Sequence, residues 1–521
     1  MNRNIFRAAN VVGGGTGLSR LLGLVREILM AWMFGTSLAK SAFDVAFLIP
    51  NLFRRLFGEG ALSAAFVPVF TETLEHDGLD GANRLAGKIG TLLATILFLS
   101  VCVGYVVMVF VQNTFEIGEK ATAVLSLLRV MLPYLFFICL VALSMGMLNS
   151  LRHFAIPALT PVLLNVVWIS ALIWICPHLG DTLEQKIQGV AMAVLFAGGV
   201  QLLVQLPVLL KKGLRPTFSF DWQDSRVRRV LLMMGPAALG MGIFQINVVI
   251  DKILAFYVGD WAPAALNYAE RLIYLPLGLV ATALGTVLLP TFSSYAARNE
   301  PHLIRETLGS ALRYVLFIMV PATVGLIVLA QPIVDLIYHL PGKRFDALST
   351  LQTTRALVFY APGLIVFSAY KVLVPAFYAQ KNTITPVKVG ACVLLLNLAL
   401  NIIFILTWPP GFKHAGLAFA TVIASLVNCT ALSVILHRQL GNPGWQSISL
   451  SAVKSILGAL IMGVTVGGVH NLVTSLPVAA QVHVKVAQIA TVLVSIIAGL
   501  AVYAVWALIA CRDEMKALRR R

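Results

Sequence analysis

Two arginines and a glutamate interrupt a stretch of the chain that is otherwise apolar. Residues 51–70, NLFRRLFGEGALSAAFVPVF, contain Arg54, Arg55 and Glu59 among side chains that favour lipid. An arginine at the centre of a bilayer costs about 2.5–3.5 kcal/mol on insertion scales, so such residues usually face a wet cavity or an anionic partner. The block therefore predicts a charged binding site inside a membrane.

Further charged residues lie in apolar segments on both sides of this block: Arg20, Arg26, Glu27 and Asp44 before it, and Asp251, Lys252, Glu270 and Arg271 after it. Arg20 and Glu27 are seven residues apart, which places them on one helix face. Four further residues follow a 4-7-4 spacing, which predicts that they form a second stripe along one face of a helix. We expect this helix to be long and to be bent at Pro50 and at glycines 58 and 60. The members of the stripe are Asp44, Leu48, Arg55 and Glu59.

Ion pairing within the protein is the alternative to ligand binding. Arg55 with Glu59, or Glu270 with a neighbouring lysine, would hold helices together without contacting a ligand. Around the first two predicted helices, however, basic groups outnumber acids. We therefore expect a bound anion to balance the excess of buried cations.

These residues lie in a chain whose composition is that of a membrane protein. Of its 521 residues, 59% are hydrophobic and 12% are charged, and the mean hydropathy is +0.88. Apolar runs of roughly 20 residues, long enough to cross the hydrocarbon core, recur along the chain. We predict an all-α polytopic fold with about fourteen transmembrane helices. Their expected ranges are 10–34, 38–72, 88–112, 123–149, 155–177, 187–210, 230–257, 262–294, 308–330, 348–378, 385–407, 413–436, 448–473 and 484–510.

The basic residues of the predicted loops alternate in number along the chain. One set of loops contains most of them, including Arg84, Lys88, Arg152, Lys211, Lys212, Arg215, Arg226, Arg298, Lys381 and the basic tail. The other set contains Lys40, Lys120, Lys186, Lys343, Arg344, Lys413 and Lys485. Because short cytoplasmic loops hold the excess of Lys and Arg, both termini are expected in the cytoplasm. The net charge of +17 reflects this orientation and contact with anionic headgroups, not nucleic acid binding.

Catalytic and metal-binding patterns are not recognisable in the sequence. The six cysteines and nine histidines are dispersed and show no ligand spacing. We therefore predict no catalytic residues, no metal site and no cofactor.

An internal repeat organises the predicted helices. Residues 25–35, VREILMAWMFG, match residues 249–259, VIDKILAFYVG, and the pairing aligns Glu27 with Asp251. Further matches at nearly the same separation pair residues 61–70 with 283–292, and residues 189–201 with 416–428. We predict an N-terminal lobe at 1–215, a C-terminal lobe at 216–440 and two added helices with a basic tail at 441–521. Six helices in each lobe imply a pseudo-twofold axis along the membrane normal.

The block at 51–70 belongs to a wider resemblance. Together with SRLLGLVR at 19–26, YAER at 268–271, GTVLLP at 285–290, TPVK at 385–388 and HAGL at 414–417, it resembles the MurJ/MviN family, the bacterial lipid II flippases. That family belongs to the multidrug/oligosaccharidyl-lipid/polysaccharide exporter superfamily. The resemblance implies a V-shaped central cavity for the diphosphate and disaccharide-pentapeptide of lipid II. It also implies that the last two helices form a groove for the polyprenyl tail.

The resemblance implies that the arginines of the family's cavity correspond in this sequence to Arg20, Arg26 and Arg271. A further one corresponds to either Arg54 or Arg55. The resemblance also places Glu59 in this signature, and the neighbouring charges Glu27, Asp44, Asp251, Lys252 and Glu270 are candidates for lining or gating the cavity. Guanidinium groups suit this task because they bind phosphate oxygens through two planar hydrogen bonds. The sequence departs from the family at Ser41, commonly acidic, and at Leu48, often lysine.

The resemblance implies transport by alternating access, in which lipid II moves from the inner to the outer leaflet of the bacterial cytoplasmic membrane. No covalent step is needed, and the energy would come from a coupled ion or the membrane potential. Lipid II and membrane lipids are the expected partners, while no protein partner can be named. A polysaccharide-unit flippase and a cation-coupled drug exporter are the alternatives. A membrane enzyme acting on polyprenyl phosphates would need clustered carboxylates or a nucleophile set.

Overall fold

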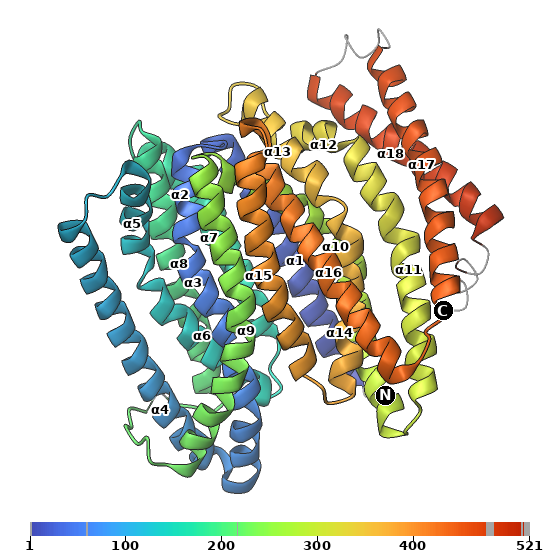
Figure 1. Cartoon of the computed structure of the whole chain (residues 1–521). Coiled ribbons are helices and arrows are strands. Elements are labelled where there is room, and N and C mark those ends of the chain that lie inside the picture. The colour runs from blue at the N-terminus through green and yellow to red at the C-terminus, as the bar shows by residue number, and fades with distance from the viewer. Residues whose placement is uncertain (1–2, 59–60, 216, 476–483, 512–513, 515–521) are drawn as a thin grey trace. The chain divides into compact units, whose positions relative to one another are not determined.

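The computed structural model describes residues 3–58, 61–215, 217–475, 484–511 and 514, and this part of the chain is built from helices without strands (Figure 1). Tertiary contacts divide the chain into two compact units, Met1–Phe256 and Tyr257–Arg521. Within the described ranges, eight helices are long and apolar enough to cross a membrane, or up to ten when each bent helix pair is one span. The all-helical, membrane-spanning class is confirmed, whereas the count of fourteen and the lobe boundaries stay predictions.

The first unit packs its helices around a core of large apolar side chains that includes Phe43, Phe66, Phe70 and Tyr134. Helix α1 packs against α7, α4 against α6, and α6 against α8. Its elements are α1 (Arg3–Phe34), α2 (Leu38–Ala46), α3 (Leu48–Phe53), a π-helical turn at Arg54–Gly58, α4 (Ala61–Thr114), α5 (Glu119–Met131), α6 (Tyr134–Ser150), α7 (Ala155–Ser170) with a π-helical continuation at Ala171–Ile175, α8 (Leu183–Lys211) and nearly all of α9 (Ser225–Val258).

The expected single helix at 38–72 is wrong, because this region is broken into several pieces. Helix α2 ends at Ala46 and α3 begins at Leu48. Pro50 accounts for the break, since it lacks an N–H and its ring clashes with the carbonyl four residues earlier. The π-helical turn then changes the helical period at Arg54 and Arg55. The predicted stripe from Asp44 through Leu48 and Arg55 to Glu59 is therefore not one face of a regular α-helix, and Glu59 lies outside the described residues.

Three more regions differ from the single unbroken helices or the loop that we predicted from the sequence. Within α4, Gly78 has φ 69° and ψ −164°, so two helices meet at this glycine where a loop at 73–87 was expected. The expected spans 123–149 and 348–378 are each a pair of helices bent by 45°. Pro133 and Pro362 precede the second helix of each pair. Both bends thus lie where a proline interrupts the helical hydrogen bonds.

The second unit contains α10 (Ala262–Ala297), α11 (Pro301–Val328), α12 (Ala330–Tyr338), α13 (Ala347–Tyr360), α14 (Gly363–Ala379), α15 (Ile384–Thr407), α16 (Lys413–Leu440), α17 (Trp445–Ser475) and α18 (Val484–Ala510). Helix α17 packs along α11 and α18 along α17 (Figure 1). The Tyr503 hydroxyl donates to the Phe317 carbonyl at 2.7 Å, which fixes α18 to α11. At the other end of α18, the Gln488 amide donates to the Asp335 carboxylate at 3.2 Å. Helix α12 was not predicted.

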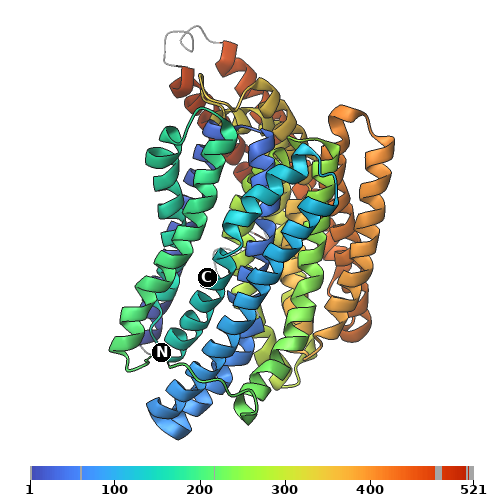
Figure 2. The same cartoon turned by 90° about the vertical axis from the view of Figure 1, so that its left-hand side faces the viewer.

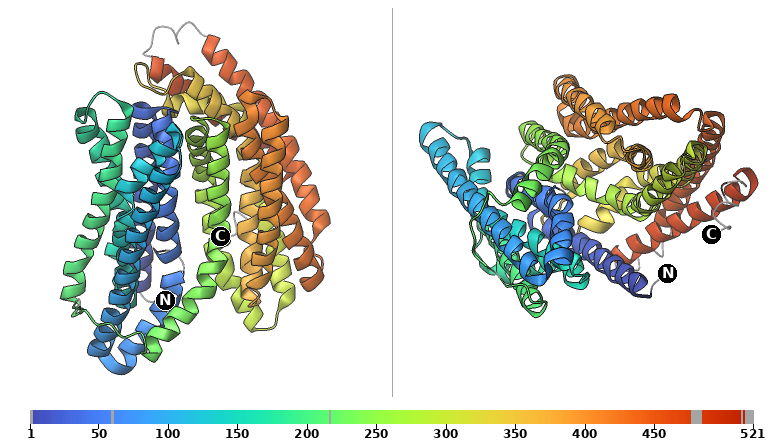
Figure 3. Two further views of the ribbon diagram at one scale, coloured as in Figure 1. Left: turned by 60° about the vertical axis from the view of Figure 1, so that its left-hand side comes forward. Right: turned by 90° about the horizontal axis from the view of Figure 1, so that it is seen from below.

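Residues 212–224, which we call the linker, connect α8 to α9 and are docked on α4 (Figures 2 and 3). The Arg215 amide donates to the Asn83 side chain at 2.9 Å, and the Ser219 amide donates to the Thr91 hydroxyl at 3.1 Å. The Lys88 ammonium lies 2.7 Å from one carboxylate oxygen each of Asp221 and Asp224. Just beyond the linker, Arg226 pairs with Asp77 and Arg229 with Glu72.

The ion pairs with Lys88 make this docking pH-dependent. The hydrogen bond from Lys88 lowers the pKa of Asp221 below its usual 3.8. For Asp224, burial raises the pKa, but hydrogen bonds from Lys88 and from backbone amides outweigh burial and lower it. Because both folded-state pKa values are depressed, the stabilisation is present above the ordinary carboxyl pKa and is lost as the pH falls through the folded values.

We predict that the double variant Asp221→Asn/Asp224→Asn speeds hydrogen exchange at the Ser219 amide at neutral pH. The global unfolding temperature should change little, since solvent screens ion pairs at the surface and they add little stability. Acidification to the depressed pKa values should abolish the difference from the wild type. Glu184→Gln, which removes an exposed acid from the start of α8, is the control. Unchanged exchange at Ser219 in the double variant would contradict this docking.

Candidate functional site

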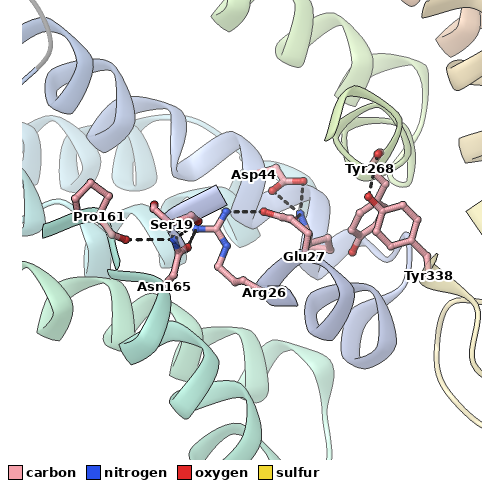
Figure 4. Close-up of polar contacts among 9 residues, drawn as sticks. Ser19, Arg26, Glu27, Asp44, Pro161, Asn165, Tyr268 and Tyr338 are labelled. Atoms are coloured by element: carbon pink, nitrogen blue, oxygen red, sulfur yellow. Dashed lines mark hydrogen bonds and ion pairs between the residues drawn. The ribbon is translucent and has the colours of Figure 1, made fainter. Parts of the chain in front are cut away.

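A network of buried charges joins α1, α2 and α7 in the first unit (Figure 4). Its centre is Arg26, which is only 8% exposed. One terminal nitrogen lies 2.7 Å from Glu27 Oε1, and the other donates to Asn165 Oδ1 at 3.0 Å. The guanidinium carbon also lies 4.2 Å from the centroid of the Trp168 ring, a cation–π contact. Arg26 is thus held by a carboxylate, an amide and an aromatic face.

Lys40 extends this network to a second carboxylate. Its ammonium lies 2.6 and 2.7 Å from the two carboxylate oxygens of Asp44, and 3.8 Å from Glu27 Oε2. From the sequence we counted Lys40 as a residue of an external loop. This is wrong, because Lys40 lies on α2 and is only 1% exposed. Two cations and two carboxylates give this four-residue cluster no formal net charge. The expected excess of cations is therefore not found at Arg26, Glu27, Lys40 and Asp44.

The neighbours of the network fix it between helices. The Asn165 amide donates to the carbonyls of Ser19 at 3.0 Å and Pro161 at 3.2 Å, so it connects α7 to α1 (Figure 4). The Trp168 ring packs edge-on against Phe43 and Phe47, with centroid distances of 5.2 and 5.6 Å. Since Trp168 is on α7 and Phe43 is on α2, the same ring that faces Arg26 also joins these two helices.

The remaining predicted residues of the first unit are more accessible. Arg20 is exposed on α1, two turns before Glu27. Arg54 is half-buried and donates from Nε to Asn51 Oδ1 at 3.1 Å. Arg55 is half-buried and forms no hydrogen bond or ion pair with any described residue. On α9, the Asp251 carboxylate accepts from the Asn247 amide at 3.3 Å, and Lys252 is half-buried.

In the second unit, Glu270 and Arg271 lie on α10. The Tyr274 hydroxyl donates to Glu270 Oε1 at 2.6 Å, while the Arg271 side chain is exposed. Beside them the buried Tyr268 packs on Tyr338 with ring centroids 4.9 Å apart, and the Tyr338 hydroxyl donates to the Tyr268 carbonyl at 3.1 Å (Figure 4). Aromatic packing thus anchors the turn of α10 that presents Arg271.

Sequence reasoning missed Lys40, Asn165 and Trp168. Lys40 had a usable signal, because a lysine four residues before an aspartate on a helix predicts an ion pair. Asn165 and Trp168 had none, since 139 residues separate Asn165 from Arg26. Among the described residues, no group of three or more His, Cys, Asp or Glu side chains gathers as a metal site would require.

Removal of Arg26 should destabilise the protein. In Arg26→Ala, Glu27 and Asn165 lose their guanidinium partner in a buried site, and breaking a buried ion pair typically costs about 3–5 kcal/mol. We therefore expect a lower unfolding temperature and lower abundance, with Arg26→Lys intermediate because it keeps the charge but loses the planar fork. Arg84→Ala, which removes an exposed arginine from α4, is the control and should unfold like the wild type. Wild-type stability of Arg26→Ala would assign Arg26 to ligand binding alone.

Comparisons with known proteins agree on one family. The family model described as lipid II flippase MurJ matches residues 30–510. A protein of Burkholderia cenocepacia named lipid II flippase MurJ is 35% identical over 466 residues, covering 87% of this chain and 88% of its own. A probable lipid II flippase MurJ of Rickettsia prowazekii is 30% identical over 505 residues and covers 96% of both chains.

Solved structures extend this agreement to the fold. A structure described as lipid II flippase MurJ in an inward closed conformation has a TM-score of 0.78 and 27% identity, and it covers 97% of this chain and 99% of its own. An inward-facing multidrug resistance MATE family transporter of the MOP superfamily has a TM-score of 0.65 at 16% identity, over 81% of this chain and 95% of its own, which shows a shared fold alone. From the family match and the curated relatives together, the chain belongs to the MurJ family.

Proposed function

We propose that this protein flips lipid II from the inner to the outer leaflet of the bacterial cytoplasmic membrane. The observation that carries the proposal is the family match across residues 30–510, supported by relatives of that name that are similar over most of both chains. The reaction is transport without a covalent step. Lipid II and the surrounding membrane lipids are its partners.

The diphosphate of the head group is bound by arginines. Arg20 and Arg271 have exposed side chains, and Arg54 and Arg55 are half-buried on a π-helical turn, a local structure that is frequent at functional sites. Guanidinium groups keep their charge when partly desolvated and bind phosphate oxygens in pairs. These four residues supply the cations that the neutral Arg26 network does not.

Arg26 is proposed to act by exchange of partners. In this structure Glu27 occupies one face of its guanidinium at 2.7 Å. A diphosphate that approached Arg26 would compete with Glu27 for the same donors, and the released Glu27 carboxylate would keep the Lys40 ammonium, 3.8 Å from its Oε2, as its nearest cation. We therefore assign a gating role to Glu27 and Asp44. We assign the same role to Asp251 and Lys252 on α9 and to Glu270 on α10.

Alternating access follows from this exchange. Breaking a buried charge network requires a replacement anion, so the bound head group favours the rearrangement that moves the lobes. The two added helices, α17 and α18, pack on α11 and are proposed to guide the polyprenyl tail. With both termini in the cytoplasm, the membrane potential would act on the moving charges, at about 2.3 kcal/mol per elementary charge per 100 mV. A coupled ion would supply energy in the same way.

Flipping is tested in a bacterium depleted of its own flippase. Expression of this chain should restore growth and the exposure of lipid II at the outer face of the cytoplasmic membrane. Arg271→Ala should abolish that exposure at normal protein abundance, because we assign a ligand-binding role to this exposed side chain. Arg271→Lys should restore it in part. Abundant wild-type protein that leaves lipid II at the inner face would contradict the proposed function.

A further inference from the structure

Every second residue from position 218 to position 222 of the linker is an exposed aromatic side chain. Phe218, Phe220 and Trp222 are 92%, 63% and 68% exposed. The residues between them face the protein, since Ser219 bonds to Thr91 and Asp221 to Lys88 on α4. This alternation is that of an extended segment with one edge docked and the other edge aromatic.

The docking contacts place this aromatic edge at a definite depth. Lys88 and Thr91 lie where the predicted membrane span 88–112 begins, and the linker joins the end of α8 at Lys211 to the start of α9 at Ser225. The three rings therefore lie level with the ends of transmembrane helices. Trp and similar amphipathic aromatic residues are enriched at that level, where polar headgroups meet the hydrocarbon core.

A glycine on α4 allows the close approach of the linker. A Cβ built on Gly87 would lie 2.7 Å from the Thr217 carbonyl oxygen and closer still to its hydroxyl. Only a glycine leaves room for the linker backbone at this position. The linker is thus seated on α4 one residue before Phe218, which fixes the direction of the aromatic edge.

Basic residues flank the aromatic edge on both sides. Lys211, Lys212, Arg215 and Arg228 are exposed and form no ion pair with any described residue. Arg226 and Arg229, by contrast, are paired with Asp77 and Glu72. Four exposed cations beside three exposed aromatic rings match a surface that is anionic outside and apolar inside, because anionic headgroups attract Lys and Arg side chains near the membrane.

We propose that the linker is a lipid-binding element, in which Phe218, Phe220 and Trp222 insert at the headgroup level and the four free cations bind anionic phospholipids. The charge pattern assigns this face to the cytoplasm, so the lipids belong to the inner leaflet. The proposal goes beyond flipping, because the bound lipids are neighbours of the transporter and not its cargo. They would hold the connection between α8 and α9 at a fixed depth.

The test uses a fluorescent label in nanodiscs. A cysteine replaces Phe220 in a background in which the exposed Cys102 and Cys392 are serine, and it carries an environment-sensitive dye. The full chain is placed in phosphatidylcholine alone, or in equal parts of phosphatidylcholine and phosphatidylglycerol. A spin-labelled lipid whose label lies just below the headgroup quenches dyes at that depth. Gln223, exposed and polar, is the matched control position.

We expect emission from position 220 to be blue-shifted and quenched, more strongly with phosphatidylglycerol, while position 223 stays water-like. Replacement of Lys211, Lys212, Arg215 and Arg228 by Gln should remove the phosphatidylglycerol dependence. A water-like, unquenched label at 220 in both membranes would overturn the proposal and leave the aromatic edge to a protein partner. Equal quenching in both membranes would overturn the anionic-lipid part. A label at position 218 repeats the test if the first variant does not fold.

Discussion

Charge inside a lipid-embedded helix bundle has to be balanced, and the arrangement of α1, α2 and α7 depends on that constraint. Arg26 and Lys40 meet this constraint by pairing with Glu27 at 2.7 Å and with Asp44 at 2.6 Å. Each charge would be costly alone, whereas together the four are neutral. Asn165 and Trp168 then orient Arg26 from α7, so the electrostatic requirement and the helix packing are met by the same contacts.

In our proposal the same balance of charge couples binding of the diphosphate head group to the rearrangement of the lobes. A neutral network does not attract an anion strongly, but it contains two cations whose present partners are carboxylates of the protein. An incoming diphosphate offers Arg26 an equivalent partner and so lowers the cost of opening the network. In our proposal Arg20, Arg55 and Arg271 meet the head group before Arg26, because they are exposed or half-buried whereas Arg26 is buried.

The sequence was sufficient for the fold class, because the length of apolar runs depends on the thickness of the bilayer and not on details of packing. It also identified Arg26, Glu27 and Asp44 as charges that need an explanation. It could not place Asn165 or Trp168 beside Arg26, since that proximity arises from the packing of α7 on α1. At Pro50 the sequence predicted a bend, but not that the helix is broken there, and it missed the break at Gly78 and the docked linker for a related reason. Periodicity measures whether a stretch can be helical, but not where a proline, a glycine or an ion pair redirects it.

The proposed exchange of Glu27 for a diphosphate on Arg26 can be measured as the affinity of the Glu27→Gln variant for a soluble diphosphate-linked disaccharide. Gln keeps the shape of the Glu27 side chain but removes its charge, which competes with the diphosphate for Arg26. We therefore expect the variant to bind the disaccharide more tightly than the wild type does. A competing carboxylate contributing about 1.4 kcal/mol would correspond to about a tenfold change in Kd. Glu184→Gln should bind like the wild type. Equal or weaker binding by a folded Glu27→Gln protein would contradict the exchange of Glu27 for a diphosphate on Arg26.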